Sequence, residues 1–320
     1  MTFDPNADIR SDNVRRAGGG SSGGGFPRGP RRGRVAIPMT GGGIGVALVA
    51  FVLVATGVVP ASVLDSLLGA GSTTGSGYEQ PVQPHTRGGA LTECRTGADA
   101  NRNDDCLVQA TVESADGLWS RIAPAAGINF REPQTVIFSR QVATACGNAT
   151  AATGPFYCPA DSTIYIDTSF YRELQARFGS SSGQLAKSYV IAHEYGHHIQ
   201  NLQGAMRGIN RRSTGPQSDA VRLELQADCY AGVWARHEAS TPGPGNSAPL
   251  LKPLTKKDVQ DALSAAAAVG DDHIQKDVAG GQVQPESWTH GSSQQRQRWF
   301  VTGYNSGEIR TCDTFAADRV

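Results

Sequence analysis

Two histidines with three residues between them constrain this chain more than any other feature of its sequence. They are His193 and His197, in the stretch V-I-A-H-E-Y-G-H-H-I-Q at 190 to 200. Residues four apart lie on one face of a helix, so both imidazoles can reach the same metal ion. Glu194 lies beside that face, where a carboxylate can take a proton from a water molecule on the metal. The pattern predicts a helix that carries two ligands of a zinc site.

A second helix is predicted to supply the third ligand. Residues 217–239 have helical periodicity, with Ser218 as a suitable N-cap. Within this helix Glu224 and Asp228 lie one turn apart on the same face. Glu224 can therefore bind the metal, while Asp228 can accept the outer N–H of a ligand histidine. Three protein ligands leave one position open for water, which is typical of a catalytic zinc site.

The sequence resembles the bacterial family of neutral zinc metallopeptidases, membrane proteins of the gluzincin type with a single predicted span. The resemblance extends from about Leu91 to the end of the chain. The stretches that carry it are T-A-C-G at 144 to 147, G-P-F-Y-C-P-A-D at 154 to 161, I-Y-I-D at 164 to 167, Y-V-I-A-H-E-Y-G-H-H-I-Q at 189 to 200, E-L-Q-A-D-C-Y-A-G-V-W at 224 to 234, G-D-D-H-I-Q at 270 to 275 and T-H-G-S-S at 289 to 293.

The resemblance implies an α+β fold, in which a mostly helical zincin-like metallopeptidase domain contains a small β-sheet. It also implies that Zn²⁺ binds at His193, His197 and Glu224, with Glu194 as the general base. The expected substrate is a peptide or a protein, although the resemblance does not supply its identity.

The first 90 residues divide into three segments by composition. Residues 1–34 are rich in Gly, Ser, Pro and Arg, which predicts a disordered cytoplasmic tail. Residues 35–59 are uncharged and long enough to cross a bilayer core of about 30 Å as one transmembrane helix. Residues 60–90 are predicted to be a flexible linker. Arginines before the apolar run, with few basic residues just after it, predict a cytoplasmic N-terminus and an extracytoplasmic domain at 91–320.

The apolar run has a second interpretation, a signal peptide cleaved near Val59-Pro60-Ala61. Both interpretations place the domain outside the cytoplasm; the first also anchors the chain in the lipid bilayer. Lys plus Arg and Asp plus Glu number 29 each, so the overall charge does not favour nucleic acid as a partner.

Six cysteines follow the apolar run, an even number that predicts disulfides in an exported domain. Fifteen pairings are possible. The two short, turn-rich loops favour Cys94 with Cys106 and Cys146 with Cys158, which leaves Cys229 with Cys312. A cysteine zinc site is disfavoured because the chain has no close C-x-x-C pair.

Periodicity predicts the remaining elements of the domain. Further helices are expected at 107–125, 171–178, 255–269 and 292–300, and strands of a small sheet at 135–138 and 163–166. Tyr165 and Asp167 are expected near a sheet edge beside the cleft. There an extended peptide could add to the sheet as a further strand.

His290, in T-H-G-S-S, is a candidate for the donor that stabilises the oxyanion of a tetrahedral intermediate. The alternative is that His290 caps the helix that follows or braces the turn. The acidic pair Asp271 and Asp272 is expected to cap a helix end, because the spacing of a dedicated calcium site is absent. His198 is expected to support the site or face the surface, and Tyr195 to line the cleft.

Two other functions stay open. The domain could be a silent exported scaffold or binding module with a structural zinc, although Glu194 weighs against this because structural sites lack an adjacent general base. It could instead hydrolyse the peptide cross-links of a cell wall with the same chemistry. Other divalent metals are compatible with a His₂Glu ligand set, and the sequence does not indicate an oligomeric state.

Overall fold

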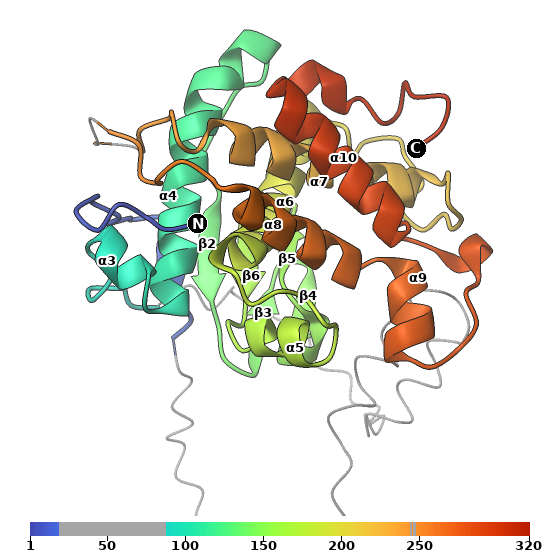
Figure 1. Cartoon of the computed structure of the whole chain (residues 1–320), viewed down its shortest axis with the longest axis horizontal. Helices are drawn as coiled ribbons and strands as arrows, with labels where there is room; N and C mark the ends of the chain where they lie inside the picture. The colour runs from blue at the N-terminus through green and yellow to red at the C-terminus, as the bar shows by residue number, and fades with distance from the viewer. Residues whose placement is uncertain (19–87, 244, 246–247) are drawn as a thin grey trace, which may run out of the picture.

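The computed structural model describes residues 1–18, 88–243, 245 and 248–320 (Figure 1). The predicted transmembrane helix at 35–59 and most of the predicted linker lie outside the described residues. No helix in the described part of the chain combines the length and the apolar character needed to cross a bilayer. The described residues form an α+β fold dominated by helices, which confirms the predicted fold class.

Long helices build the centre of this fold. They are α4 (Asp104–Ile122), α6 (Gln184–Gln203), α7 (Asp219–His237), α8 (Lys256–Ala268) and α10 (Ser293–Ser306). The helix with the two histidines, α6, packs against α4, α7 and α8, and α10 lies across α7 (Figure 1). Large side chains such as Trp119, Tyr189 and Trp234 are buried in this core. The metal motif therefore lies on the central helix of the core.

Every helix predicted for residues 91–320 is present, and local sequence explains where two of them begin. Ser218 caps α7 by accepting the N–H of Val221, and Thr255 caps α8 in a capping box with Asp258. The shorter elements are α3 (Gly97–Ala100), α5 (Phe170–Ala176), α9 (Asp271–His273), the 3₁₀ turns η1 (Pro124–Ala126), η2 (Ala151–Thr153), η4 (Pro285–Ser287) and η5 (Ile309–Cys312), and the π turn η3 (Ile274–Val278).

A glycine inside the metal motif allows α6 and α7 to approach closely. A Cβ atom on Gly196 would lie 2.9 Å from the carbonyl oxygen of Ala227 and 3.0 Å from its Cα. Real side chains do not tolerate such contacts with backbone, so glycine is required at this crossing. The close approach lets Glu224 on α7 reach the histidines on α6.

Within the described residues, the main sheet has four strands in the order β1-β2-β6-β5. They are β1 (Val14–Arg16), β2 (Gln134–Ile137), β6 (Thr163–Ile166) and β5 (Phe156–Cys158), of which only β5 runs antiparallel to its neighbour. The helices cover one face of the sheet, and the hairpin of β3 (Gln141–Thr144) and β4 (Gly147–Thr150) packs on the other. Both predicted strands are present, as β2 and β6.

The expected place of Tyr165 at a sheet edge is wrong. Tyr165 belongs to β6, which is paired on both sides, with β2 and with β5. Asp167 follows β6 and accepts the backbone N–H groups of Arg140 and Ser169. The edge strand that packs against α6 is β5. The prediction failed because the short run F-Y-C at 156 to 158 is not recognisable as a strand without its partner.

The prediction that residues 1–34 are a disordered tail is wrong for residues 1–18, here called the N-terminal arm. Three apolar side chains of the arm, Phe3, Ile9 and Val14, are at most 1% exposed and belong to the main core. Strand β1 of the arm forms one edge of the sheet, in parallel with β2. Composition did not reveal this packing because only a few widely spaced side chains are buried.

All three expected disulfides are present, Cys94–Cys106, Cys146–Cys158 and Cys229–Cys312. The second one ties the hairpin of β3 and β4 to the edge strand β5. The third ties η5, near the C-terminus, to α7, the helix that carries Glu224. Cross-links of this kind restrict the unfolded chain, so each is expected to stabilise the fold.

Glu113 on α4 predicts a dependence of stability on pH. Burial, opposed by a hydrogen bond from Ser11 and assisted by nearby acidic groups, raises the pKa of this carboxyl from 4.5 to about 7. The unfolded chain releases this proton at lower pH than the folded protein, so stability should fall as the pH rises from about 4.5 to about 7.

Glu113→Gln should remove this loss. At pH 8 the variant should gain up to about 3 kcal/mol in free energy of unfolding, with a much smaller gain at pH 4.5. Urea unfolding at both pH values measures the difference, with Glu286→Gln at an exposed position as the matched control. An equal gain at both pH values would contradict the assignment.

Candidate metal centre and active site

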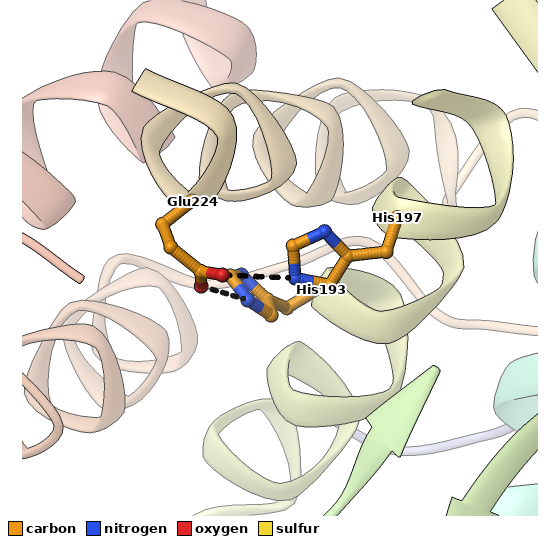
Figure 2. A group of neighbouring side chains, drawn as sticks. All are labelled: His193, His197 and Glu224. Atoms are coloured by element: carbon orange, nitrogen blue, oxygen red, sulfur yellow. Dashed lines mark hydrogen bonds and ion pairs between the residues drawn. The ribbon is translucent and has the colours of Figure 1, made fainter. Parts of the chain in front are cut away.

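The structure brings His193, His197 and Glu224 together at the crossing of α6 and α7 (Figure 2). The Nε2 atom of His193 lies 3.1 Å from one carboxylate oxygen of Glu224, and Nε2 of His197 lies 3.5 Å from the other. Four ligands arranged as a tetrahedron around zinc, with bonds of about 2.0–2.1 Å, lie about 3.3 Å apart. The donor atoms therefore have the type and spacing that a zinc ion requires.

The three side chains are held in a largely buried site. His193 and His197 are 7% and 8% exposed, and their rings meet edge to face with centroids 4.8 Å apart. Figure 2 shows both rings directed toward the carboxylate of Glu224. Among the residues that the structure describes, no other group of His, Cys, Asp or Glu is arranged to hold a metal.

Asp228 fixes the orientation of His193. The Nδ1 atom of His193 donates to Oδ1 of Asp228 over 2.8 Å, which directs Nε2 at the candidate metal position. Tyr189, one turn earlier on α6, donates its hydroxyl to the same carboxylate. Asp228 is fully buried, so its oxygens are satisfied by protein groups alone.

Arg296 on α10 balances the charge of Asp228, and sequence reasoning missed it. Its Nε donates to Oδ2 over 2.8 Å and its guanidinium NH₂ to Oδ1 over 3.0 Å, which makes a bidentate pair. Burial raises the pKa of Asp228, but the charges of Arg296 and His193 outweigh burial and hold that pKa below its ordinary value. One signal was available: Arg296 shares the helix face of Trp299 and Phe300, so a buried acidic partner could have been expected.

His197 is held by an amide rather than by a carboxylate. Its Nδ1 donates to Oε1 of Gln200 over 2.8 Å. The amide is fixed in this orientation because its Nε2 donates to the carbonyl of Leu223 and to Oε1 of Gln226. Gln226 in turn donates to the carbonyl of Cys312 over 3.0 Å. Sequence reasoning missed Gln200, although its position three residues after His197 places it on the same helix face.

Glu194 follows His193 directly on α6 and is 8% exposed. Among the described residues, no side chain or backbone group makes a hydrogen bond with its carboxylate. Its position beside the two histidines agrees with the place that sequence reasoning gave to a general base.

His290 lies on the loop before α10, with its side chain 47% exposed. Asp271 organises this loop, because one of its oxygens accepts the backbone N–H groups of Thr289, His290 and Gly291. The other oxygen lies 3.4 Å from Nδ1 of His290. Desolvation lowers the pKa of His290, but the hydrogen bond and charge of Asp271, with a smaller contribution from the charge of Glu224, outweigh it and raise that pKa. His290 therefore lies within electrostatic reach of the candidate metal site.

His290 does not cap α10, because Ser292 is the N-cap of that helix. The other alternative, that His290 braces the turn, agrees with its contacts: its Nδ1 lies 2.9 Å from the hydroxyl of Thr289 and 3.4 Å from a carboxylate oxygen of Asp271. The acidic pair does bind backbone groups, as expected of capping residues. Asp272 accepts the N–H of Ser293, the first residue of α10, while Asp271 holds the loop that precedes it.

The other two residues of the motif face away from the metal position. His198 is 1% exposed, so it is not a surface residue, and it contacts Tyr157 of β5 over 3.0 Å and the carbonyl of Arg131 over 2.6 Å. Burial lowers the pKa of His198 to about 4, so it is neutral. Tyr195 is fully buried and donates to Asp116 on α4. The expectation that Tyr195 lines the cleft is therefore wrong.

These observations define a helical α+β protein with an inward-facing donor set of two histidines and a glutamate, next to a free carboxylate. Comparison with known protein families agrees with this description. The chain matches the family described as "Putative neutral zinc metallopeptidase" over residues 5–315, and it belongs to this family.

Two relatives illustrate how widely the sequence is shared. "Uncharacterized protein Rv2575" of Mycobacterium tuberculosis is 51% identical over 227 residues, which cover 71% of this chain and 76% of the relative. "Uncharacterized protein YpfJ" of Escherichia coli K12 is 40% identical over 214 residues, which cover 65% of this chain and 69% of the relative. No solved structure matches the chain significantly.

The ligand set predicts how metal content responds to substitution. The chain should bind one zinc ion, and both His193→Ala and Glu224→Ala should lose it, because two remaining ligands hold the ion weakly. Elemental analysis of the purified proteins measures this. If Glu224→Ala retains a full complement of zinc, Glu224 is not the third ligand.

Loss of the side-chain amide of Gln200 should weaken zinc binding less than loss of a metal ligand does. Gln200→Ala should weaken zinc binding about 10- to 100-fold, because His197 loses the partner that orients it. Competition with a chromophoric chelator measures the affinity. Gln260→Ala removes an exposed glutamine from α8 and should leave the affinity unchanged; an equal effect of both variants would contradict the role of Gln200.

Proposed function

We propose that this chain is a zinc-dependent metallopeptidase that hydrolyses peptide bonds. The single observation that carries the proposal is the convergence of His193, His197 and Glu224, with Glu194 next to them and unengaged by other described groups. The membership of the family supports hydrolysis as the reaction class. A purely structural zinc site usually has four protein ligands, so the scaffold alternative is less well supported.

The bound metal would supply a Lewis acid that lowers the pKa of water at its open position to about 7 and polarises a carbonyl oxygen. Glu194 takes the proton as the water oxygen attacks the carbonyl carbon of the peptide bond. It then returns this proton to the leaving amine, so that the products are a carboxylic acid and an amine. His290 donates a hydrogen bond to the carbonyl oxygen as negative charge develops there.

The edge strand β5 is the proposed docking site for the substrate. It is the edge strand of the main sheet that packs against α6, and β6 pairs with only one of its sides. Tyr157 in the middle of β5 is connected to α6 through His198 and Asn201. An extended peptide that pairs with the outer side of β5 would therefore be held in a fixed relation to the metal helix.

We further propose that the domain acts outside the cytoplasm. All six cysteines are paired in disulfides, which persist in oxidising compartments and are rare in the cytosol. Attachment to a membrane through residues 35–59 stays a prediction of the sequence. Cell-wall peptide cross-links are an alternative substrate that the same chemistry would serve.

Glu194→Gln tests the proposal most directly. The variant should lose at least about 100-fold in kcat, because general base catalysis typically contributes a factor of that order or more. Its zinc content should be unchanged, because Glu194 is not a ligand. Hydrolysis of unfolded protein and of purified cell-wall peptides, followed by mass spectrometry, measures activity and separates the two substrate classes.

Glu286→Gln, at an exposed position, is the matched control and should retain full activity. Full activity of Glu194→Gln would contradict the assignment of Glu194 as the general base. A native protein that binds zinc but hydrolyses neither substrate class would favour the scaffold.

A further inference from the structure

Cys312 contacts α7 at two points on one face of that helix. Its side chain forms the disulfide with Cys229, and its carbonyl accepts a hydrogen bond from Nε2 of Gln226 over 3.0 Å. Gln226 and Cys229 are three residues apart, so they are neighbours on the helix surface. Both belong to E-L-Q-A-D-C at 224 to 229, the stretch that also supplies the third candidate ligand. The disulfide therefore holds a backbone carbonyl beside Gln226.

The residues that follow Cys312 keep its carbonyl in place. The N–H of Thr314 donates to this carbonyl over 2.9 Å, and the hydroxyl of Thr314 donates to the carbonyl of Arg222 over 2.7 Å. Arg222 lies one turn before Gln226 on α7, and its guanidinium donates to the carbonyl of Ala317 over 2.7 Å. Cys312 and Thr314 are both fully buried. This segment is therefore attached to α7 on both sides of the contact with Gln226.

The carbonyl of Cys312 determines which way the amide of Gln226 points, because a carbonyl can only accept hydrogen bonds. The NH₂ group of Gln226 must face it, which leaves Oε1 to accept from Nε2 of Gln200 over 3.0 Å. The NH₂ group of Gln200 also donates to the carbonyl of Leu223, so its Oε1 faces Nδ1 of His197. The two backbone carbonyls thus fix the direction of each hydrogen bond in the chain.

The direction of this amide chain decides how His197 is presented to the metal position. An amide oxygen only accepts, so Nδ1 must donate to it, which directs Nε2 at the candidate metal position. Gln200 is fully buried, so water cannot replace Gln226 as the acceptor of its amide hydrogen. A buried donor without an acceptor is costly. We therefore expect Gln200, and with it His197, to shift when Gln226 is lost.

We infer that the Cys229–Cys312 disulfide is a positioning element of the metal site as well as a cross-link of the fold. It acts through the amides of Gln226 and Gln200, which orient His197. A cross-link that only restricts the unfolded chain would stabilise the fold without setting the metal affinity of the folded protein. The inference rests on the proposed zinc site, but it does not depend on hydrolysis of any substrate.

The zinc affinity of the full-length chain, measured by competition with a chromophoric chelator, tests the inference. Gln226→Met keeps the disulfide but ends the amide chain, whereas Cys229→Ala/Cys312→Ala removes the anchor of the chain and leaves no thiol to bind zinc. Each change should weaken zinc binding roughly threefold to tenfold, which is less than the range of about 10- to 100-fold for a direct partner of a ligand.

The two changes should not add, because both act on the same chain of hydrogen bonds. A variant with all three substitutions should bind zinc no more weakly than the weaker-binding of its two parents. If the two effects multiply, the disulfide acts independently of Gln226 and the inference is wrong. Unchanged zinc affinity in Gln226→Met would also overturn it, and this variant keeps every native cross-link, so it decides the matter even if the cysteine variant folds poorly.

Two matched controls should bind zinc as tightly as the native chain. Cys94→Ala/Cys106→Ala removes a disulfide that is equally buried, and Gln184→Met removes a half-buried amide that donates to the carbonyl of Asn101. An equal loss of affinity on removal of either disulfide would contradict the inference. A native chain that binds no zinc would overturn the proposed function together with the inference, whereas native binding with unchanged variants would overturn the inference alone.

Nuclear magnetic resonance separates the orientation of the ring from general stability. In the zinc-loaded chain with ¹⁵N-labelled histidine, the Nδ1–H groups of His193 and His197 should each give a signal, assigned with Gln200→Ala. The Gln226 variant and the Cys229/Cys312 variant should shift the signal of His197 or speed the exchange of its proton with water. The signal of His193, whose partner is Asp228, should stay unchanged. Equal changes in both rings, or none in His197, would overturn the inference.

Discussion

The buried ion pair of Arg296 and Asp228 is the contact on which the candidate site depends. Asp228 on α7 accepts hydrogen bonds from His193 and Tyr189, which are both on α6. It also accepts a hydrogen bond from Arg296 on α10. Leaving one member of such a pair unpartnered typically costs about 3–5 kcal/mol. The pair therefore fixes the relative positions of three helices and the ring orientation of one candidate ligand. Gly196, at the crossing of α6 and α7, makes this arrangement possible. It lets the two helices come close enough for side chains of α6 to reach the carboxylate of Asp228 on α7.

The two histidines are oriented by different chemistry, and this divides the site into two halves. His193 faces the buried ion pair of Asp228 and Arg296, whose opposite charges offset each other. His197 faces a chain of amides that runs through Gln200 and Gln226 to the carbonyl of Cys312. The region after α8 contributes no candidate ligand, yet it supplies Arg296, the loop with His290 and the end of the amide chain. Its disulfide to Cys229 holds that region against the helix that carries Glu224.

The arm shows why composition misjudged the beginning of the chain. Glycine, serine and arginine dominate residues 1–34, and such segments usually have too little apolar surface to fold alone. The arm does not fold alone, because its three buried side chains enter a core made by other elements, and its backbone pairs with strands and loops of the domain. The same reason explains the misplaced sheet edge. Whether a short strand is central or outer depends on its neighbours, so the run at 163–166 was recognised as a strand but its position in the sheet was not.

The sequence by itself determined what depends on local geometry. Helical periodicity placed His193, Glu194 and His197 on one helix and Glu224 with Asp228 on another, and short loops indicated two of the disulfide pairs. The resemblance to a known family indicated the α+β class and the ligand set. Only the tertiary structure decided the partners, which include Arg296 for Asp228, Gln200 for His197, Asp271 for the loop of His290 and the domain itself for the arm. The physical reason is that spacing along a helix is fixed by 3.6 residues per turn. Contacts between side chains from distant segments depend instead on how the whole core packs.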